Sequence, residues 1–337
     1  MARSQSLLVL LGVALGGLVT AAPQLQQLPH GGAPCGSDWD CALGGVCNAS
    51  KLCQCDVWFT GANCTLLNLQ PAKEQNGLNI DGWSTWGGHA VRDEADNSWR
   101  GFFSLMASKC TLGAYSTNSG SVAAVAAEVD GPYTVADPAQ PDAPANWAVA
   151  PPSHCTQIKR HPNGDYHLWH ILPGNGVNDP GYKNCSKPPD SGADPAVARG
   201  WQQQEPPGAG FSQNLWIHTA KSPRGPWSKN GTQINVTNFK VGTTAKQSWC
   251  SAPYYYENGT ALLVWGGQGG PVVGASVWAG LSDEWQGPYS EVEAAPIESL
   301  KQIEDPAIFR DPRGNLHMLT NANSGHAHCK AGGACFT

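Results

Sequence analysis

The stretch "EDPAIFRDPRGNLHML", residues 304–319, places a tight polar turn between two short apolar runs. A glycine in such a turn supplies the positive φ that lets the two runs pair as an antiparallel hairpin. The same order of strand, polar turn and strand occurs earlier as "HAVRDEADNSWRGFFSLMA" (89–107), "HCTQIKRHPNGDYHLWHIL" (154–172) and "SAPYYYENGTALLVWGG" (251–267). We therefore predict a repeated β-hairpin as the building block of the fold.

A second repeated element closes the units. "VDGPY" (129–133), "PRGPW" (223–227) and "WQGPY" (285–289) share Gly-Pro-aromatic, and each follows a strand-like run. One unit therefore contains about four short antiparallel strands. Four-stranded units repeated around an axis form a β-propeller. A β-sandwich has a similar number of strands but no ordered repeat, so we predict an all-β fold of the propeller type.

The N-terminus has the pattern of a cleaved secretory signal peptide. Arg3 precedes the apolar run Leu7–Val19, and Val19-Thr20-Ala21 offers small residues at a cleavage site. We therefore assign residues 1–21 to a signal peptide and expect a secreted, extracellular protein. An uncleaved anchor is the alternative, but the run is short for a membrane span, and no other apolar stretch is long enough to cross a bilayer.

Composition agrees with export and excludes some partners. The twelve cysteines fit an oxidising compartment. A net charge of −6 without a long basic run argues against nucleic acid and against an anionic membrane surface. Sequons predict glycosylated surface loops at four asparagines: Asn48, Asn230, Asn235 and Asn258.

Six of the cysteines lie within residues 35–64, with the spacing C-x5-C-x5-C-x5-C-x-C-x8-C. So short a stretch cannot bury much apolar surface, and disulfides are the usual substitute. Six cysteines allow fifteen pairings, and spacing alone does not choose among them.

This stretch ends in an aromatic-Thr-Gly-x-x-Cys turn and resembles an epidermal-growth-factor-like module. The resemblance implies the disulfides Cys35–Cys47, Cys41–Cys53 and Cys55–Cys64. Calcium-binding modules of this kind carry an acidic cluster before the first cysteine, where this chain has "HGGAPC", so we expect no calcium. We assign residues 31–65 to the module and 66–79 to a linker. The module is either a contact surface for a cell-surface protein or a spacer.

The later part of the chain, residues 80–337, resembles the propeller glycosidases of glycoside hydrolase family 43 and their relatives. The repeat and the Asp-Pro hairpin at 304–319 carry this resemblance. It implies five blades. The repeats correspond to blades at 83–133, 150–227 and 248–289, and to the first half of a fourth blade from residue 303. We therefore expect an incomplete propeller, from a chain that continues beyond this sequence.

Hydrolysis of a glycosidic bond needs two carboxyl groups, one to protonate the leaving oxygen and one to activate water or attack. The resemblance implies an Asp at the start of blade one as base, a second Asp that tunes pKa values, and a Glu as acid. Aligning the inner strands on their turns places Asp305 opposite Gly87, Cys155 and Ala252. Glu304 and Asp305 are therefore the catalytic candidates, and the absence of the blade-one aspartate leaves hydrolysis open.

Aromatic faces stack on the apolar faces of sugar rings, and polar side chains orient sugar hydroxyls. The substrate-binding candidates beside the inner strands are Trp83, Trp86, Trp249, His89 and His154. Each also has an alternative role in packing, because most of the fourteen tryptophans must fill the space between blades.

No metal ion or cofactor is expected. His326 and His328 in "SGHAHC" alternate along a strand, but no third ligand accompanies them. The sequence contains no Ser-His-Asp triad motif, phosphate-binding loop or Rossmann fingerprint. The six cysteines after the first module suggest three more disulfides, with Cys329–Cys335 as a local pair.

Two functions remain open at this point. The first is a secreted glycosidase-like protein that acts on or binds a polysaccharide. The second is a non-catalytic glycan-binding or cell-surface adhesion protein with an epidermal-growth-factor-like contact module. The missing blade-one aspartate favours the second function, and the pair Glu304 and Asp305 favours the first.

Overall fold

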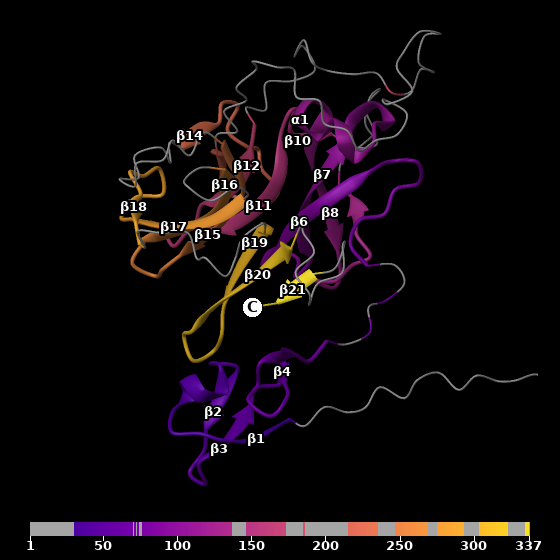
Figure 1. The fold of residues 1–337 in the computed structure, drawn as a ribbon. Helices are drawn as coiled ribbons and strands as arrows, with labels where there is room; N and C mark the ends of the chain where they lie inside the picture. The colour runs from indigo at the N-terminus through magenta and orange to yellow at the C-terminus, as the bar shows by residue number, and fades with distance from the viewer. Residues whose placement is uncertain are drawn as a thin grey trace, which may run out of the picture. The chain divides into compact units, whose positions relative to one another are not determined.

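The computed structural model describes residues 30–69, 71, 73, 76–136, 146–172, 185, 215–234, 247–268, 275–292, 303–322 and 334–336. The chain divides into two compact units, residues 1–69 and 70–337. Both consist mainly of short β-strands (Figure 1). Within the described ranges, no helix is long and apolar enough to cross a membrane. The predicted signal peptide, residues 1–21, lies outside the described residues.

The first unit is small and held by short strands. Its sheet has the order β1 (Gly31–Pro34), β3 (Leu52–Cys55) and β2 (Gly45–Cys47), and β4 (Phe59–Thr60) pairs with β5 (Leu66–Leu67). A 3-10 helix, η1 (Asp38–Cys41), begins after Ser37, which forms a capping box with Asp40. Reciprocal hydrogen bonds of this kind satisfy the backbone donors at the start of a helix.

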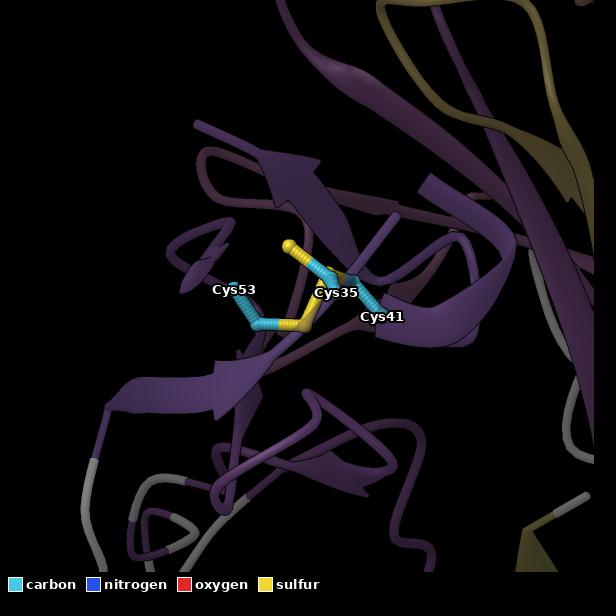
Figure 2. A group of neighbouring side chains, drawn as sticks. All are labelled: Cys35, Cys41 and Cys53. Carbon is cyan, nitrogen blue, oxygen red and sulfur yellow. A yellow bond between two sulfur atoms is a disulfide. The ribbon is translucent and has the colours of Figure 1, made fainter. Parts of the chain in front are cut away.

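Disulfides form the centre of the first unit. They join Cys35 to Cys47, Cys41 to Cys53 and Cys55 to Cys64, which are the pairs that the resemblance implies. Figure 2 shows the bond between Cys41 and Cys53, with Cys35 beside it. Cys41 and Cys64 are fully buried and pack against Phe59. Covalent bonds therefore replace the apolar core that a unit of this size cannot build.

The segment 66–79, predicted as a linker, contributes to both units at its ends. Leu66 and Leu67 form β5 within the first unit. At the other end, the backbone of Gly77 exchanges hydrogen bonds with Asp130 and Tyr133, and Leu78 is buried in the core of the second unit. The two ends of the segment are ordered because their apolar residues pack against the core of the adjoining unit.

In the described residues, the second unit contains four consecutive antiparallel sheets. The first sheet consists of β6 (Thr85–Arg92), β7 (Trp99–Met106), β8 (Ser119–Ala126) and β10 (Trp147–Val149), with β9 (Thr134–Val135) also paired to β8. The segment between β7 and β8 contains η2 (Ala107–Lys109), η3 (Leu112–Ala114) and α1 (Tyr115–Asn118).

The other three sheets repeat this meander. The second sheet consists of β11 (His154–Arg160), β12 (Tyr166–Ile171), β13 (Leu215–Ala220) and β14 (Thr232–Ile234). The third consists of β15 (Gln247–Tyr255), β16 (Ala261–Gln268), β17 (Ala275–Ser282) and β18 (Ser290–Glu291). The fourth consists of β19 (Ile303–Arg310), β20 (Leu316–Ala322) and β21 (Ala334–Phe336).

Apolar layers separate consecutive sheets. Phe102 of the first sheet packs with Ile158 of the second, Trp169 of the second with Leu263 of the third, and Ala252 and Val264 of the third with Ile308 of the fourth. The first strands of the sheets are neighbours in the order β6, β11, β15 and β19 (Figure 1). Meanders that pack face to face in chain order are the arrangement of propeller blades.

The turns within the hairpins have the predicted chemistry. Gly164, Gly259 and Gly314 have φ values of 94°, 93° and 96°, which side-chain-bearing residues rarely adopt. The Gly-Pro-aromatic closures also repeat in structure, because the hydroxyl groups of Tyr133 and Tyr289 each donate to the carbonyl four residues earlier, at 2.8 Å. The repeat read from the sequence is therefore a repeat of structure.

Candidate functional site

Each innermost strand contains a β-bulge near its start. The register of pairing shifts between Trp86 and His89 in β6 and between His154 and Gln157 in β11. It shifts between Ser248 and Ser251 in β15 and between Glu304 and Ala307 in β19. Bulges re-aim side chains and are common next to active sites. The four bulges are thus structurally equivalent positions at one end of the sheets.

The residue at the centre of the bulge has a left-handed backbone in three of the four strands. Gly87, Cys155 and Asp305 have φ values of 56°, 54° and 51°. For residues other than glycine this conformation costs about 1–2 kcal/mol, although Asp tolerates it better than most. Strained backbone of this kind clusters at ligand sites and active sites. Cys155 and Asp305 are therefore held in place by their surroundings.

One part of the sequence alignment is wrong. Gly87 and Cys155 occupy the positions equivalent to Asp305, as aligned, but Ala252 does not. Ala252 is paired in register with Val264, and the bulge of β15 contains Trp249 and Cys250 instead. Counting back from the turns, Tyr255 against Arg310, reaches Cys250, and not Ala252, for the position of Asp305. The stretch from Ser251 to Tyr255 is one residue longer than Ala307–Arg310 in β19, which moves the equivalent position one further, to Trp249.

Three of the sheets meet at Asp305. A disulfide joins Cys155 of the second sheet to Cys250 of the third. Oδ1 of Asp305 lies 3.8 Å from Sγ of Cys155. This is a contact and not a hydrogen bond, because a disulfide sulfur has no proton to donate. Asp305 itself is half-buried, so that the carboxylate is both positioned and partly accessible.

The sulfur atoms near Asp305 are not metal ligands. Cys155, Cys250 and Asp305 have potential ligand atoms within 4.8 Å of one another, as do Cys35, Cys41 and Cys53 (Figure 2). All five of these cysteines are in disulfides. Only a thiolate binds zinc or a similar ion with the usual strength. Neither group is therefore a metal site in the oxidised protein.

One stripe of β11 faces the centre of the second unit. Cys155 contacts the third and fourth sheets, and the Nε2 amide of Gln157 donates to the carbonyl of Pro306 in the fourth sheet at 3.1 Å. Nζ of Lys159 lies 3.0 Å from Nε2 of His89 in the first sheet. Gln157 and Lys159 are alternate residues beyond the bulge and share a face. Together with Cys155, whose sulfur contacts the third and fourth sheets, they line the axis around which the sheets are arranged.

The predicted residue His89 belongs to this axial group. Burial, and next the charge of Lys159, lowers the pKa of His89 to about 3, so the ring is neutral. Burial lowers the pKa of Lys159 to about 8, so the amine is still mainly protonated at neutral pH. Sequence reasoning missed Lys159 and Gln157. They alternate along β11, but alternation alone does not tell which face of a strand is central.

His154, in contrast, faces the first sheet. Its Nδ1 lies 2.8 Å from Oγ of Ser119, and its ring packs against Tyr115 with centroids 5.0 Å apart. Burial lowers the pKa of His154 to about 3. Trp86 is half-buried and packs with Tyr115 against the apolar cluster that contains Met106. An aromatic group of Trp86, Tyr115 and His154 thus lies beside the first two bulges.

Of the remaining candidates, Trp83 lies away from the axis, and Trp249 and Glu304 are described by their positions in the strands. Trp83 packs against the core of the first sheet. Trp249 lies in the bulge of β15, and Glu304 pairs with Asn321 at the start of β19. His326, His328 and Cys329 lie outside the described residues. Cys110 pairs with Cys185, and Cys155 with Cys250.

Two turn carboxylates have structural roles. Asp311, which is 5% exposed, accepts hydrogen bonds from Arg313, Asn315 and His317. Burial opposes its ionisation, but these bonds hold the pKa of Asp311 well below its ordinary value. Asp93, 3% exposed, accepts bonds from Arg100 in its own sheet and from Arg224 in the second sheet. These carboxylates stabilise the end of the sheets that carries the hairpin turns, which is opposite the end with the bulges.

The predicted glycosylation sites have different surroundings. Asn230 and Asn258 are exposed, and Asn48 is half-buried with its Oδ1 accepting from the backbone of Ser50 and Leu52. Asn235 lies outside the described residues. Asn258 also lines a shallow depression of about 430 Å³ at the hairpin turns, together with Glu257 and Arg310.

No family model matches the chain, and no curated protein matches it in sequence. In structure it is similar to an endo-arabinase from Bacteroides thetaiotaomicron, with 10% sequence identity, 77% of each chain covered and a TM-score of 0.49. It is similar to a family 117 glycoside hydrolase from Zobellia galactanivorans, with 12% identity, 76% and 69% of the two chains covered and a TM-score of 0.48. An endo-1,4-beta-xylanase from Bacteroides thetaiotaomicron has 12% identity, 75% of each chain covered and a TM-score of 0.45.

Proposed function

We propose that this chain is a secreted, carbohydrate-binding protein whose second unit is a five-bladed, glycosidase-like propeller. The polysaccharide binds where the bulges of the innermost strands meet. The observation that carries this proposal is the position of Asp305, which lies among three sheets beside the Cys155–Cys250 disulfide. A carboxylate held in this way accepts hydrogen bonds from sugar hydroxyls.

The residues next to Asp305 support a sugar ligand. Trp86 and Tyr115 are half-buried aromatic side chains beside the bulges of β6 and β11. Aromatic faces offer apolar contact to the CH faces of a sugar ring. Oε1 of Gln157 is a buried acceptor without a hydrogen-bond partner, and Nδ1 of His89 is a buried nitrogen without one. Buried polar atoms of this kind favour ligands rich in hydroxyl groups.

Binding is favoured over hydrolysis by the residues at the bulges. Hydrolysis needs two carboxyl groups across the scissile bond. The positions equivalent to Asp305 hold Gly87 in β6, Cys155 in β11, and Trp249 with Cys250 in the bulge of β15. Hydrolysis is the second candidate function, and the adjacent Glu304 is the one observation that favours it.

The first unit supports a role at the cell surface. Its three disulfides have the pairing of an epidermal-growth-factor-like module, and they require an oxidising compartment. Several of its apolar side chains are exposed, among them Trp39 at 77% and Trp58 at 55%. We assign to this module the contact with a cell-surface protein.

The test compares glycan binding by the unmodified protein, Asp305→Gly and Asp305→Asn on a glycan array, followed by calorimetry on the glycans that bind. Glycine keeps the left-handed backbone without strain, and asparagine keeps the shape without the charge. Both variants should lose at least about tenfold in affinity. Glu94→Gln, in an exposed ion pair at the turn end, is the matched control and should bind normally. Normal binding by both Asp305 variants would overturn the site, and no binding by the unmodified protein would overturn the function.

A further inference from the structure

Lys159, one of the residues of β11 that line the axis, and His89 of β6 form a hydrogen-bonded pair beside that axis. Nζ of Lys159 lies 3.0 Å from Nε2 of His89. A protonated lysine can only donate, so Nε2 of His89 accepts and the ring proton is on Nδ1. That Nδ1 is buried and has no hydrogen-bond partner. The pair therefore carries a positive charge on Lys159, while the N–H group of His89 is buried on the other side of the ring.

Lys159 is half-buried, whereas the other described lysines of the second unit are exposed. Lys73 pairs with Asp130, and Lys221 with Asp165, but Lys159 forms no ion pair within the part of the chain that the structure describes. Removal of a charged amine from water is costly unless an opposite charge is near. Part of the Lys159 side chain is in contact with solvent.

The position of this pair relative to Asp305 fits one extended ligand. Gln157 links the two, because its Nε2 donates to the carbonyl of Pro306, the residue after Asp305, and it lies two residues before Lys159 on β11. Gln157 lies between the levels of Cys155 and Lys159 on β11, and its Oε1 is a buried acceptor without a partner. A sugar hydroxyl group can donate to this oxygen while an acidic group on the same sugar accepts from Lys159.

We propose that the axial site selects an anionic sugar, whose carboxylate or sulfate ester binds Lys159 while its hydroxyl groups bind Gln157 and Asp305. This inference rests on the proposed function and names the class of its ligand. The net charge of −6 agrees with recognition of a single acidic group inside the site, because it provides no general attraction for polyanions. Nucleic acid and anionic lipid are therefore poor competitors.

The first experiment uses the unmodified protein and matched ligands. Calorimetry compares a galacturonic acid oligomer with its methyl ester, and a sulfated galactan oligosaccharide with its desulfated counterpart. The acidic member of one pair should bind about tenfold or more tightly, as expected for a charge-assisted contact. The pair that shows the difference identifies carboxylate or sulfate as the group recognised. Equal affinity for acidic and neutral members would overturn this inference and leave the proposed function intact.

A second experiment locates the contact. Lys159→Met keeps the length of the side chain without the charge, and Lys229→Met changes an exposed lysine as the matched control. Lys159→Met should remove the preference for the acidic ligand over its neutral counterpart, whereas Lys229→Met should keep that preference. A preference that persists in Lys159→Met would place the anion elsewhere and overturn the inference. If all four ligands fail to bind the unmodified protein while neutral glycans bind on the array, the inference is overturned and the proposed function stands; absence of binding across the whole array would overturn the proposed function.

Discussion

Oδ1 of Asp305 lies 3.8 Å from Sγ of Cys155, although the two residues are 150 positions apart in the chain. Cys155 is bonded in turn to Cys250, so a disulfide between two sheets forms one wall of the space around a carboxylate of another sheet. The backbone of Asp305 has a φ of 51°. Position and conformation of this carboxylate therefore depend on cross-links between distant parts of the chain.

Removal of this cross-link should affect stability and binding together. The bond between Cys155 and Cys250 closes a loop of 95 positions, and loss of a disulfide typically costs about 2–4 kcal/mol. The double variant Cys155→Ala/Cys250→Ala should lose that amount in urea denaturation and should also bind glycan more weakly. Cys35→Ala/Cys47→Ala is the control in the first unit, and it should leave glycan affinity unchanged. If the double variant Cys155→Ala/Cys250→Ala keeps its full glycan affinity, the disulfide does not position the carboxylate of Asp305.

Two neighbouring acidic residues should respond differently to loss of charge. Asp93 is buried; burial opposes its ionisation, but hydrogen bonds from Arg224 and Ala95 hold its pKa below the ordinary value. Asp93→Asn should therefore reduce the free energy of unfolding by about 1–3 kcal/mol, because two guanidinium groups lose their partner. Glu94→Gln breaks only an exposed pair with Arg160 and should change it by less than about 1 kcal/mol. Urea denaturation of both variants checks this, and equal effects would contradict a link between the first two sheets through Arg224.

Stability should fall in mild acid because histidines are buried in the neutral form. Burial lowers the pKa of His154 to about 3, and burial with the neighbouring His218 lowers that of His170 to about 3. The unfolded chain protonates its histidines near pH 6.5, so it binds more protons than the folded chain between pH 6.5 and 3. The free energy of unfolding should therefore decrease as the pH falls through this window, by up to about 1.4 kcal/mol per pH unit for each histidine.

Denaturation in urea between pH 7 and 5 measures this slope above the ordinary range of carboxylates. His170→Phe removes one titrating group and should reduce the slope. A free energy that stays constant from pH 7 to 5 would contradict the neutral, buried state of these rings.

The repeat was predictable from the sequence because its signals are local. Turn glycines such as Gly164 and Gly314 and the Gly-Pro-aromatic closures follow from backbone rules that act over a few residues. The pairing of the first six cysteines followed from a resemblance. The bond from Cys155 to Cys250 did not, because a separation of 95 positions leaves no pattern in the spacing.

The axial site was only partly predictable. Asp305 and His89 were chosen from their places near strand starts, and both lie near the axis. Gln157 and Lys159 were missed because a strand's alternation gives two faces without telling which one is central. Contacts with other sheets settle that choice. Ala252 was aligned three positions beyond Trp249. The extra residue after the bulge of β15 accounts for one of these positions, and a bulge has no sequence signal of its own.

Gly87 offers a direct test of why hydrolysis would be absent. It has nearly the same φ as Asp305, at 56° and 51°, and a Cβ built on it meets nothing within 4 Å. Gly87→Asp should therefore fold with a loss of only about 1–2 kcal/mol, since the cost is that of the left-handed backbone. Gly88→Asp is the matched control, because its Cβ would overlap the ring of Phe103, and it should be much less stable.

The folded Gly87→Asp variant would place a second carboxylate across the site from Asp305, as hydrolysis requires. If lack of that group is what limits catalysis, release of reducing ends from a bound polysaccharide should rise by about 10²-fold or more, the usual contribution of a general base. The double variant Gly87→Asp/Asp305→Asn should lose this gain. A stable Gly87→Asp protein that binds glycan and releases no reducing ends would remove hydrolysis as the second candidate function, and would leave binding as the role of the bulge residues.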